Sequence, residues 1–243
     1  VMVSKLTKKN IKRIDNRNSS ELRDVKITPN YLPDSEGSAL IEVGNTKVIC
    51  SATIEKKVPR WLKGKGSGWV TAEYSMLPRS SKDRIQRERF KVSGRTQEIQ
   101  RLIGRSLRSI VDLEMLGEVS IIIDCDVIRA DGGTRTASIT GGTVALYKAL
   151  QKIEKEDAIK NLVAAISVGI CKDELLLDLD YEEDSNAQCD VNIVMNEALE
   201  LIEVQGTGEE KAFSKEQFKD LVDLAENGLK DLFTLQKEVI KNG

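Results

Sequence analysis

The chain has 243 residues, 40% of them hydrophobic and 31% charged, with a formal net charge of −2. This composition predicts one compact domain over residues 1–243, or two intimately packed halves, with a substantial core. The chain lacks any run of about 18 apolar residues that would predict a membrane span. The absence of histidine excludes Ser-His-Asp and Cys-His catalysis. Any catalysis therefore has to use carboxylates, other polar side chains, backbone amides or a metal ion.

Residues 1–12 are polar and basic, and they lack the apolar centre of a secretory signal. We therefore expect them to form a polar N-terminal extension of the domain. The four cysteines are scattered along the chain without a C-x-x-C pair: Cys50, Cys125, Cys171 and Cys189. This pattern is typical of free buried thiols in a reducing cytoplasm.

The first part of the chain is predicted to contain strands followed by a helix and a further strand. Residues 23–57 alternate in the manner of strands, with a turn at Gly44-Asn45, and 69–77 form another predicted strand. An apolar stripe predicts a helix from about 95 to 116, and a nearly continuous apolar strand follows at 118–128.

The second part of the chain loosely repeats this order. A helix is predicted at about 134–154, and four strands follow at 161–171, 174–180, 190–196 and 199–204. Ser214, with Gln217 three residues later, has the spacing of a capping box at the start of the last helix. Because the strands cluster instead of alternating with helices, the sequence predicts an α+β fold with antiparallel pairing.

Charge is unevenly distributed along the chain. Residues 1–150 contain 27 Lys and Arg against 17 Asp and Glu, whereas residues 151–243 contain 10 against 22. The most basic stretch is 79–95, whose net charge is +5. A basic half is typical of a protein that binds a polyanion, although charges that intermix on the folded surface would give the same counts.

The segment 131–138 joins an apolar strand to a helix and is a candidate phosphate site. Unbonded amides at the helix start, with glycines that allow close approach, favour an anion near Gly133. Thr134 and Ser138 carry hydroxyl donors, and Arg135 can bind a phosphate through two nitrogens. An ordinary turn and helix cap is the alternative.

The segment Ser93-Gly94-Arg95-Thr96 combines the same features at the start of the preceding helix. Its amides and the Arg95 guanidinium could bind a second part of an anion. A solvated basic helix face is the alternative interpretation.

Six carboxylates lie within thirteen residues and form another candidate site: Asp178, Asp180, Glu182, Glu183, Asp184 and Asp190. Clusters of oxygen ligands suit Mg²⁺ or Mn²⁺. In a chain without histidine they are also the natural general acids. A solubilising acidic loop is the alternative.

Six strings of residues stand out along the chain: GWVTAEY (68–74), GRTQEIQRLI (94–103), DCDV (124–127), ADGGTRTASITG (130–141), DLDYEEDS (178–185) and EVQGT (203–207). With them, the chain resembles the ribonuclease PH family over nearly its whole length, from about Arg13 to the C-terminal helix. Where that family often begins Arg-Pro-Asp-Gly-Arg, this chain has Arg13-Ile14-Asp15-Asn16-Arg17.

The resemblance implies a fold of two similar β–α halves with mixed and antiparallel sheets, and a homohexamer built as a trimer of dimers. It implies a phosphate-dependent 3′→5′ exoribonuclease that trims the 3′ ends of tRNA precursors and other RNAs and releases nucleoside diphosphates. The resemblance then implies that inorganic phosphate is the co-substrate and that a divalent metal ion, expected to be Mg²⁺, is the cofactor. The RNA path is expected to pass the basic stretch, through Arg84, Arg87 and Arg89.

The resemblance also assigns roles to single residues. The family's two catalytic aspartates match Asp184 and Asp190, which are expected to hold the metal ion as well. Its phosphate-binding positions match Arg95, Thr134 and Arg135.

Two alternatives remain open at this point. A metal-dependent nuclease that uses water as the nucleophile would work equally well without phosphate. An inactive RNA-binding ring subunit is the second alternative, and the joint presence of four site residues argues against it: Arg95, Arg135, Asp184 and Asp190.

Overall fold

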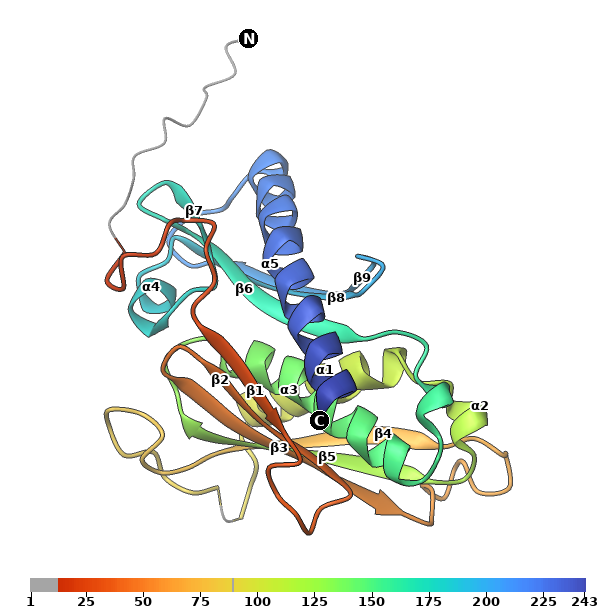
Figure 1. Cartoon of the computed structure of the whole chain (residues 1–243). Helices are drawn as coiled ribbons and strands as arrows, with labels where there is room; N and C mark the ends of the chain where they lie inside the picture. The colour runs from red at the N-terminus through yellow and green to blue at the C-terminus, as the bar shows by residue number, and fades with distance from the viewer. Residues whose placement is uncertain (1–12, 89) are drawn as a thin grey trace.

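The computed structural model describes residues 13–88 and 90–243, so the expected extension 1–12 and Arg89 lie outside the described residues. The described chain forms two sheets with helices between and beside them (Figure 1). None of the described helices is both long and apolar enough to cross a membrane.

The first half contains a five-stranded sheet in the order β1-β2-β3-β5-β4, in which all neighbours are antiparallel except β4 and β5. Its strands are β1 (Val25–Pro29), β2 (Gly37–Val43), β3 (Thr46–Glu55), β4 (Trp69–Met76) and β5 (Ser120–Arg129). Parallel neighbours need a crossover, and here it contains α1 (Gly94–Ser109) and α2 (Leu113–Leu116). Alternate residues of β3 are buried, as the period of two predicts: Val48, Cys50 and Ala52.

The second half contains a four-stranded antiparallel sheet in the order β7-β6-β8-β9. Its elements are the 3₁₀ turn η1 (Glu156–Ala158), β6 (Val163–Cys171), β7 (Glu174–Leu177), α4 (Tyr181–Ser185), β8 (Cys189–Asn196), β9 (Leu201–Gly208) and α5 (Lys215–Asn242). Every residue of β6 is buried, because helices cover this strand and two other strands flank it.

The helix α3 (Thr134–Lys152) lies between the two sheets and contacts β2 and β3 on one side and β6 on the other (Figure 1). Most of its residues are therefore buried. One hydrophobic cluster fills the space between the first sheet, α1 and α3, and a second fills the space between the other sheet and α5. The N-terminus of α3 consequently opens at the junction of the two halves.

The expected α+β fold of two β–α halves, with mixed and antiparallel sheets, is confirmed. The single predicted helix from 95 to 116 is wrong at its end, because α1 stops at Ser109 and Val111 pairs with Ile159 in an isolated bridge. The Asp112 side chain then accepts hydrogen bonds from two amides of α2 and starts a new helix. The apolar pattern thus continues from α1 into α2, but Asp112 caps α2 and makes it a separate helix.

The predicted strand 174–180 is also too long. It ends at Leu177, because Asp178 adopts the left-handed conformation with φ of +54° and turns the chain away from the sheet. The helix α4 was not predicted from the sequence, and it begins with a capping box formed by Asp180 and Glu183. The spacing of those two residues was a usable signal for this helix.

Candidate active site

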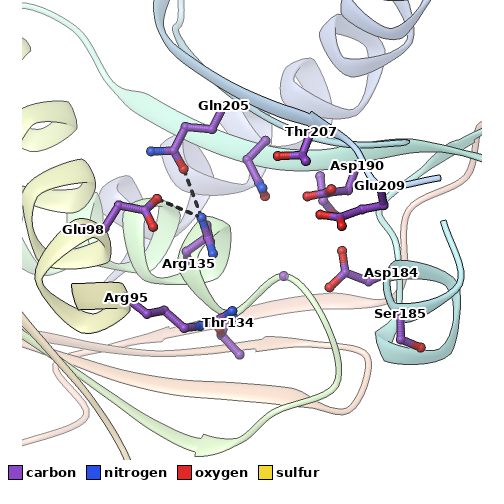
Figure 2. Close-up of a pocket in the computed structure, with 13 residues that line it drawn as sticks. Arg95, Glu98, Thr134, Arg135, Asp184, Ser185, Asp190, Gln205, Thr207 and Glu209 are labelled. Atoms are coloured by element: carbon purple, nitrogen blue, oxygen red, sulfur yellow. Dashed lines mark hydrogen bonds and ion pairs between the residues drawn. The ribbon is translucent and has the colours of Figure 1, made fainter. Parts of the chain in front are cut away.

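A pocket of about 520 Å³ lies where the two halves meet (Figure 2). Both of its arginines come from the first half, whereas three carboxylates, Asp184, Asp190 and Glu209, come from the second. The full lining is Arg95, Glu98, Gly133, Thr134, Arg135, Ser167, Asp184, Ser185, Asp190, Asn192, Gln205, Thr207 and Glu209. The fold therefore brings the two predicted phosphate segments and part of the acidic cluster into one site.

The start of α3 forms the floor of the phosphate side. Gly133 is the N-cap residue and has φ of +66°, a left-handed conformation that glycine adopts without Cβ strain. No side chain of the described residues caps this helix, so its first amides are available to an anion.

The Thr134 hydroxyl forms a hydrogen bond of 2.9 Å with the Tyr74 hydroxyl, and burial raises the pKa of Tyr74.

Two neighbours hold Arg135 at the pocket wall. Its Nη1 donates to Gln205 Oε1 at 3.0 Å and to Glu98 Oε1 at 3.3 Å (Figure 2). Arg95 lies in the first turn of α1 and extends toward Thr134. The Ser93 side chain caps α1 by accepting a hydrogen bond from the Thr96 amide. Two guanidinium groups and one helix start are therefore placed around the same volume.

Ser138 was predicted as a phosphate ligand, but it does not line the pocket. The residue is fully buried, and its hydroxyl donates to the Thr134 carbonyl oxygen at 2.8 Å. Serine hydroxyls inside helices commonly bond in this way to the carbonyl four residues earlier. We therefore leave Ser138 out of the proposed phosphate site.

The acidic side of the pocket is crowded with negative charge. Burial raises the pKa of Asp184, and the negative charge of Glu209 raises it further. The positive charges of Arg135 and Arg95 lower the same pKa. Burial, Asp184 and Glu209 together raise the pKa of Asp190. Each of these two aspartates is thus less ready to ionise than a free carboxyl, and a bound cation would relieve the crowding.

The donor set of this side fits a hard divalent cation. Mg²⁺ is commonly held by one or two carboxylates, and water and substrate phosphates complete its coordination. Among the described residues, no group of three or more Cys, Asp or Glu side chains forms a metal cage. The pair Asp184 and Asp190 supplies the two carboxylates that such an ion commonly uses.

Only two members of the acidic cluster reach the pocket, and the others have structural partners or face solvent. Asp178 pairs with Arg23, Asp180 and Glu183 cap α4, and Glu182 is exposed. The alternative of a solubilising role therefore remains open for Glu182 alone.

Arg23, which precedes β1, ties the two sides of the pocket together. Its guanidinium forms a buried ion pair of 2.6 Å with Asp178 and also donates to the Asp131 carbonyl oxygen at 2.6 Å. Burial would raise the pKa of Asp178, but the hydrogen bonds from Arg23 outweigh it and hold that pKa below its usual value. The turn before α3 and the chain before α4 are thus bound to one side chain.

Several pocket residues were not identified from the sequence: Glu98, Ser167, Ser185, Asn192, Gln205, Thr207 and Glu209. Four of them lie within the strings that carried the family resemblance, so a signal for them was present: Glu98, Ser185, Gln205 and Thr207. Ser167 lies in the fully buried strand β6, where no local pattern distinguishes it from its neighbours.

The predicted RNA-binding residues Arg84 and Arg87 do not belong to the pocket. They lie between β4 and α1 and line a separate hollow of about 330 Å³ with Gln86 and Phe90. Arg89 lies outside the described residues. This segment leads into α1 and Arg95, so the basic stretch and the pocket are adjacent along the chain.

The chain matches the model of the 3′ exoribonuclease family in two successive parts, domain 1 over residues 21–150 and domain 2 over residues 161–228. A ribonuclease PH from Bacillus pumilus (strain SAFR-032) is 58% identical over 235 residues, which cover 93% of this chain and 97% of that protein.

Solved structures show the same fold at low sequence identity. Rrp46 from rice (Oryza sativa) superposes with a TM-score of 0.75 at 20% identity, over 95% of this chain and 99% of that chain. A chain of the Archaeoglobus fulgidus exosome, solved with RNA bound to the active site, gives a TM-score of 0.78 at 22% identity over 91% of each chain. The two family matches and the full-length identity together establish that this chain belongs to the 3′ exoribonuclease family, as a close relative of ribonuclease PH.

Proposed function

We propose that this chain is a phosphorolytic 3′→5′ exoribonuclease that uses inorganic phosphate to shorten tRNA precursors and other RNAs from their 3′ ends, releasing nucleoside diphosphates. The observation that carries the proposal is the pocket in which Arg95 and Arg135 face Asp184 and Asp190. The similarity to a ribonuclease PH over nearly the whole of both chains supports it.

Inorganic phosphate would bind to Arg95 and Arg135, with the Thr134 hydroxyl and the open amides of α3 as further donors. The two guanidinium groups offset the repulsion between the attacking phosphate and the anionic RNA backbone. They also hold a phosphate oxygen in line with the last phosphodiester of the RNA. That oxygen forms a bond to phosphorus while the bond to the 3′ oxygen of the penultimate nucleotide breaks.

The carboxylate side would handle the leaving group. The departing 3′ oxygen takes up a proton, supplied by an aspartate of the pocket or by a water molecule. We propose that Asp184 and Asp190 hold a divalent ion, Mg²⁺ in the first instance, which when bound polarises the diester and screens its charge. Gln205 and Glu98 keep Arg135 in place on the opposite wall.

A hydrolase that uses water as the nucleophile is the competing function. Such an enzyme needs an anion site for the scissile phosphodiester, but not a second one for an attacking phosphate. The pair Arg95 and Arg135, next to the open start of α3, therefore favours phosphate as the attacking group. Asp184 and Asp190 in the same pocket favour an active enzyme over an inactive RNA-binding subunit.

We further propose that the chain works in the cytoplasm as a homohexameric ring, a trimer of dimers, with Arg84, Arg87 and Arg89 close to the RNA path. The family resemblance of the sequence implies this assembly, and the chain shares its fold with a chain of the Archaeoglobus fulgidus exosome. The four cysteines are free and buried, which is how thiols are kept in a reducing compartment.

The proposal is tested by incubating a tRNA that carries a short 3′ extension, with and without inorganic phosphate, and identifying the released nucleotides by chromatography. We expect nucleoside diphosphates in the presence of phosphate and no shortening in its absence. Nucleoside monophosphates at equal rates in both reactions would establish the hydrolase instead. RNA binding without any shortening would establish the inactive subunit.

A further inference from the structure

The guanidinium of Arg13 is enclosed at the outer side of α4, away from the pocket. Its side chain is 0% exposed, and Nε and Nη2 donate to the two carboxylate oxygens of Glu183 at 2.7 and 2.6 Å. The same guanidinium donates to the carbonyl oxygens of Leu177 and Asp178, both at 2.9 Å. Arg13 therefore binds the end of β7 and the body of α4 at once.

The segment that carries Arg13 has a fixed turn. The Asn16 amide donates to the Arg13 carbonyl oxygen at 3.0 Å, and Asn16 has φ of +63°. Asparagine tolerates this left-handed conformation better than most residues. The replacement of the family's usual glycine by Asn16 is therefore compatible with the turn that directs Arg13 toward Glu183.

Glu183 connects Arg13 to the first turn of α4. Its carboxylate also accepts a hydrogen bond from the Asp180 amide at 3.1 Å, and its own amide donates to Asp180 Oδ1 at 2.9 Å. The next residue is Asp184, whose amide donates to the Asp180 carbonyl oxygen at 2.9 Å. A helix of five residues is too short to persist by itself, so its direction depends on such tertiary bonds.

Consecutive residues of a helix project about 100° apart. With Glu183 fixed on Arg13, the neighbouring Asp184 is turned into the pocket, opposite the arginines (Figure 2). Arg13 itself is not part of the pocket lining. Any effect of Arg13 on the reaction must therefore be indirect, and Asp184 is the proposed catalytic residue that directly follows its partner Glu183.

We infer that Arg13 is a positioning residue for phosphorolysis, which acts through Glu183 to hold Asp184 at its place in the pocket. The inference rests on the proposed function of Asp184. The phosphate side belongs to α1 and α3 of the other half, so loss of Arg13 should leave phosphate binding intact.

The test compares the phosphorolysis kinetics of Arg13→Ala, Arg13→Lys and Glu183→Gln in the full chain. We expect Arg13→Ala to lower kcat about 10- to 100-fold, the loss typical of a catalytic group displaced by about 1 Å. The KM for phosphate should stay within about twofold of that of the unmodified chain. Arg13→Lys keeps the charge but not the two parallel bonds to a carboxylate, so its kcat should be intermediate.

A double substitution separates positioning from general loss of stability. In an Asp184→Asn background, adding Arg13→Ala should lower kcat by less than about twofold, because the group that Arg13 positions is already altered. Lys148→Ala is the matched control. Lys148 is a buried cation bonded to the Ile240 carbonyl oxygen at 3.1 Å, far along α3 from the pocket, and its loss should leave kcat unchanged.

The outcomes distinguish this inference from the proposed function. If Asp184→Asn retains full turnover, the role of Asp184 is wrong. If Asp184→Asn loses turnover but Arg13→Ala and Glu183→Gln keep it, only the positioning inference is overturned. Equal losses of kcat by Arg13→Ala in both backgrounds would also overturn it. If Arg13→Ala does not fold, Glu183→Gln and Arg13→Lys test the inference in its place. It then requires that they lower kcat while the KM for phosphate stays unchanged.

Discussion

Gly132 lies directly against the backbone of Asp180. A Cβ built on Gly132 would come within 2.6 Å of the Asp180 carbonyl carbon, and the glycine has φ of +75°. The turn that enters the phosphate side of the pocket is thus in contact with the residue that caps α4. Because this contact is with backbone atoms, a larger side chain would have to push the two sides of the pocket apart.

Gly132→Ala should therefore destabilise the protein and reduce phosphorolysis together. The left-handed backbone alone costs an alanine about 1–2 kcal/mol, and the clash adds to that. Urea unfolding measures the loss of stability. Gly94→Ala is the control, because a Cβ there meets no atom within 4 Å, and it should change the free energy of unfolding by less than about 0.5 kcal/mol. Equal stability of the two variants would show that the Gly132 contact is unimportant.

Arg135→Ala should mainly weaken phosphate binding. A hydrogen bond to a charged group contributes roughly 1.5–3 kcal/mol, which corresponds to an apparent affinity about 10- to 100-fold lower. Phosphate saturation curves of the phosphorolysis reaction measure this change. Arg60→Ala, at an exposed position outside the pocket, serves as the control. A saturation curve that does not move would remove Arg135 from the phosphate site.

Asp184→Asn and Asp190→Asn should each fold and bind tRNA but lose most phosphorolysis. Asparagine is nearly isosteric with aspartate, so the packing survives while the charge is lost. Losing an electrostatic contact to a transition state typically costs about 100- to 1000-fold in rate. Extra Mg²⁺ or Mn²⁺ should restore part of it if the two residues hold the metal.

Glu182→Gln is the matched control for these two variants. Glu182 is exposed on the same short helix and does not line the pocket. The turnover of Glu182→Gln should therefore equal that of the unmodified chain. Asp180 is unsuitable as a control, because its side chain caps α4. Turnover close to normal in both aspartate variants would refute their assignment.

Replacing Arg84, Arg87 and Arg89 together by Gln should weaken tRNA binding and flatten its dependence on salt. Each lost phosphate contact reduces the slope of log K against log salt by about 0.7 for single-stranded RNA. Binding titrations between low and high salt measure the slope. Lys219→Gln with Lys230→Gln removes exposed charges from α5 as a comparison. A slope identical to that of the unmodified chain would show that the basic stretch makes no phosphate contacts.

Asp178→Asn should destabilise the protein in a pH-dependent manner. Removing one partner of a buried ion pair costs about 3–5 kcal/mol at neutral pH. The pKa of Asp178 in the folded state lies below its ordinary value of 3.8, so its stabilising effect is complete above that value and is lost as the pH falls through the lower pKa. Urea unfolding at a series of pH values should give a constant difference between the two proteins from neutral pH down to about 5, narrowing only below it. A difference that already narrows near neutral pH would contradict the ion pair.

The sequence by itself determined the local parts of this protein. Alternation and helical stripes placed most strands and helices. The residue types at Arg95, Gly133 and Arg135, and the family resemblance at Asp184 and Asp190, identified groups that line the pocket. These features could be predicted because hydrophobic periodicity, capping patterns and family motifs are each carried by residues that lie close together in the sequence.

Only the tertiary structure decided how those groups are used. Arg135 is held by Gln205, 70 positions away, and Asp178 is paired with Arg23, 155 positions away. No local pattern specifies such partners, because they depend on how α3 packs between the two sheets. The same packing turns Ser138 into the core and Asp184 into the pocket, since the direction of a side chain follows from the placement of its whole element against the rest of the fold.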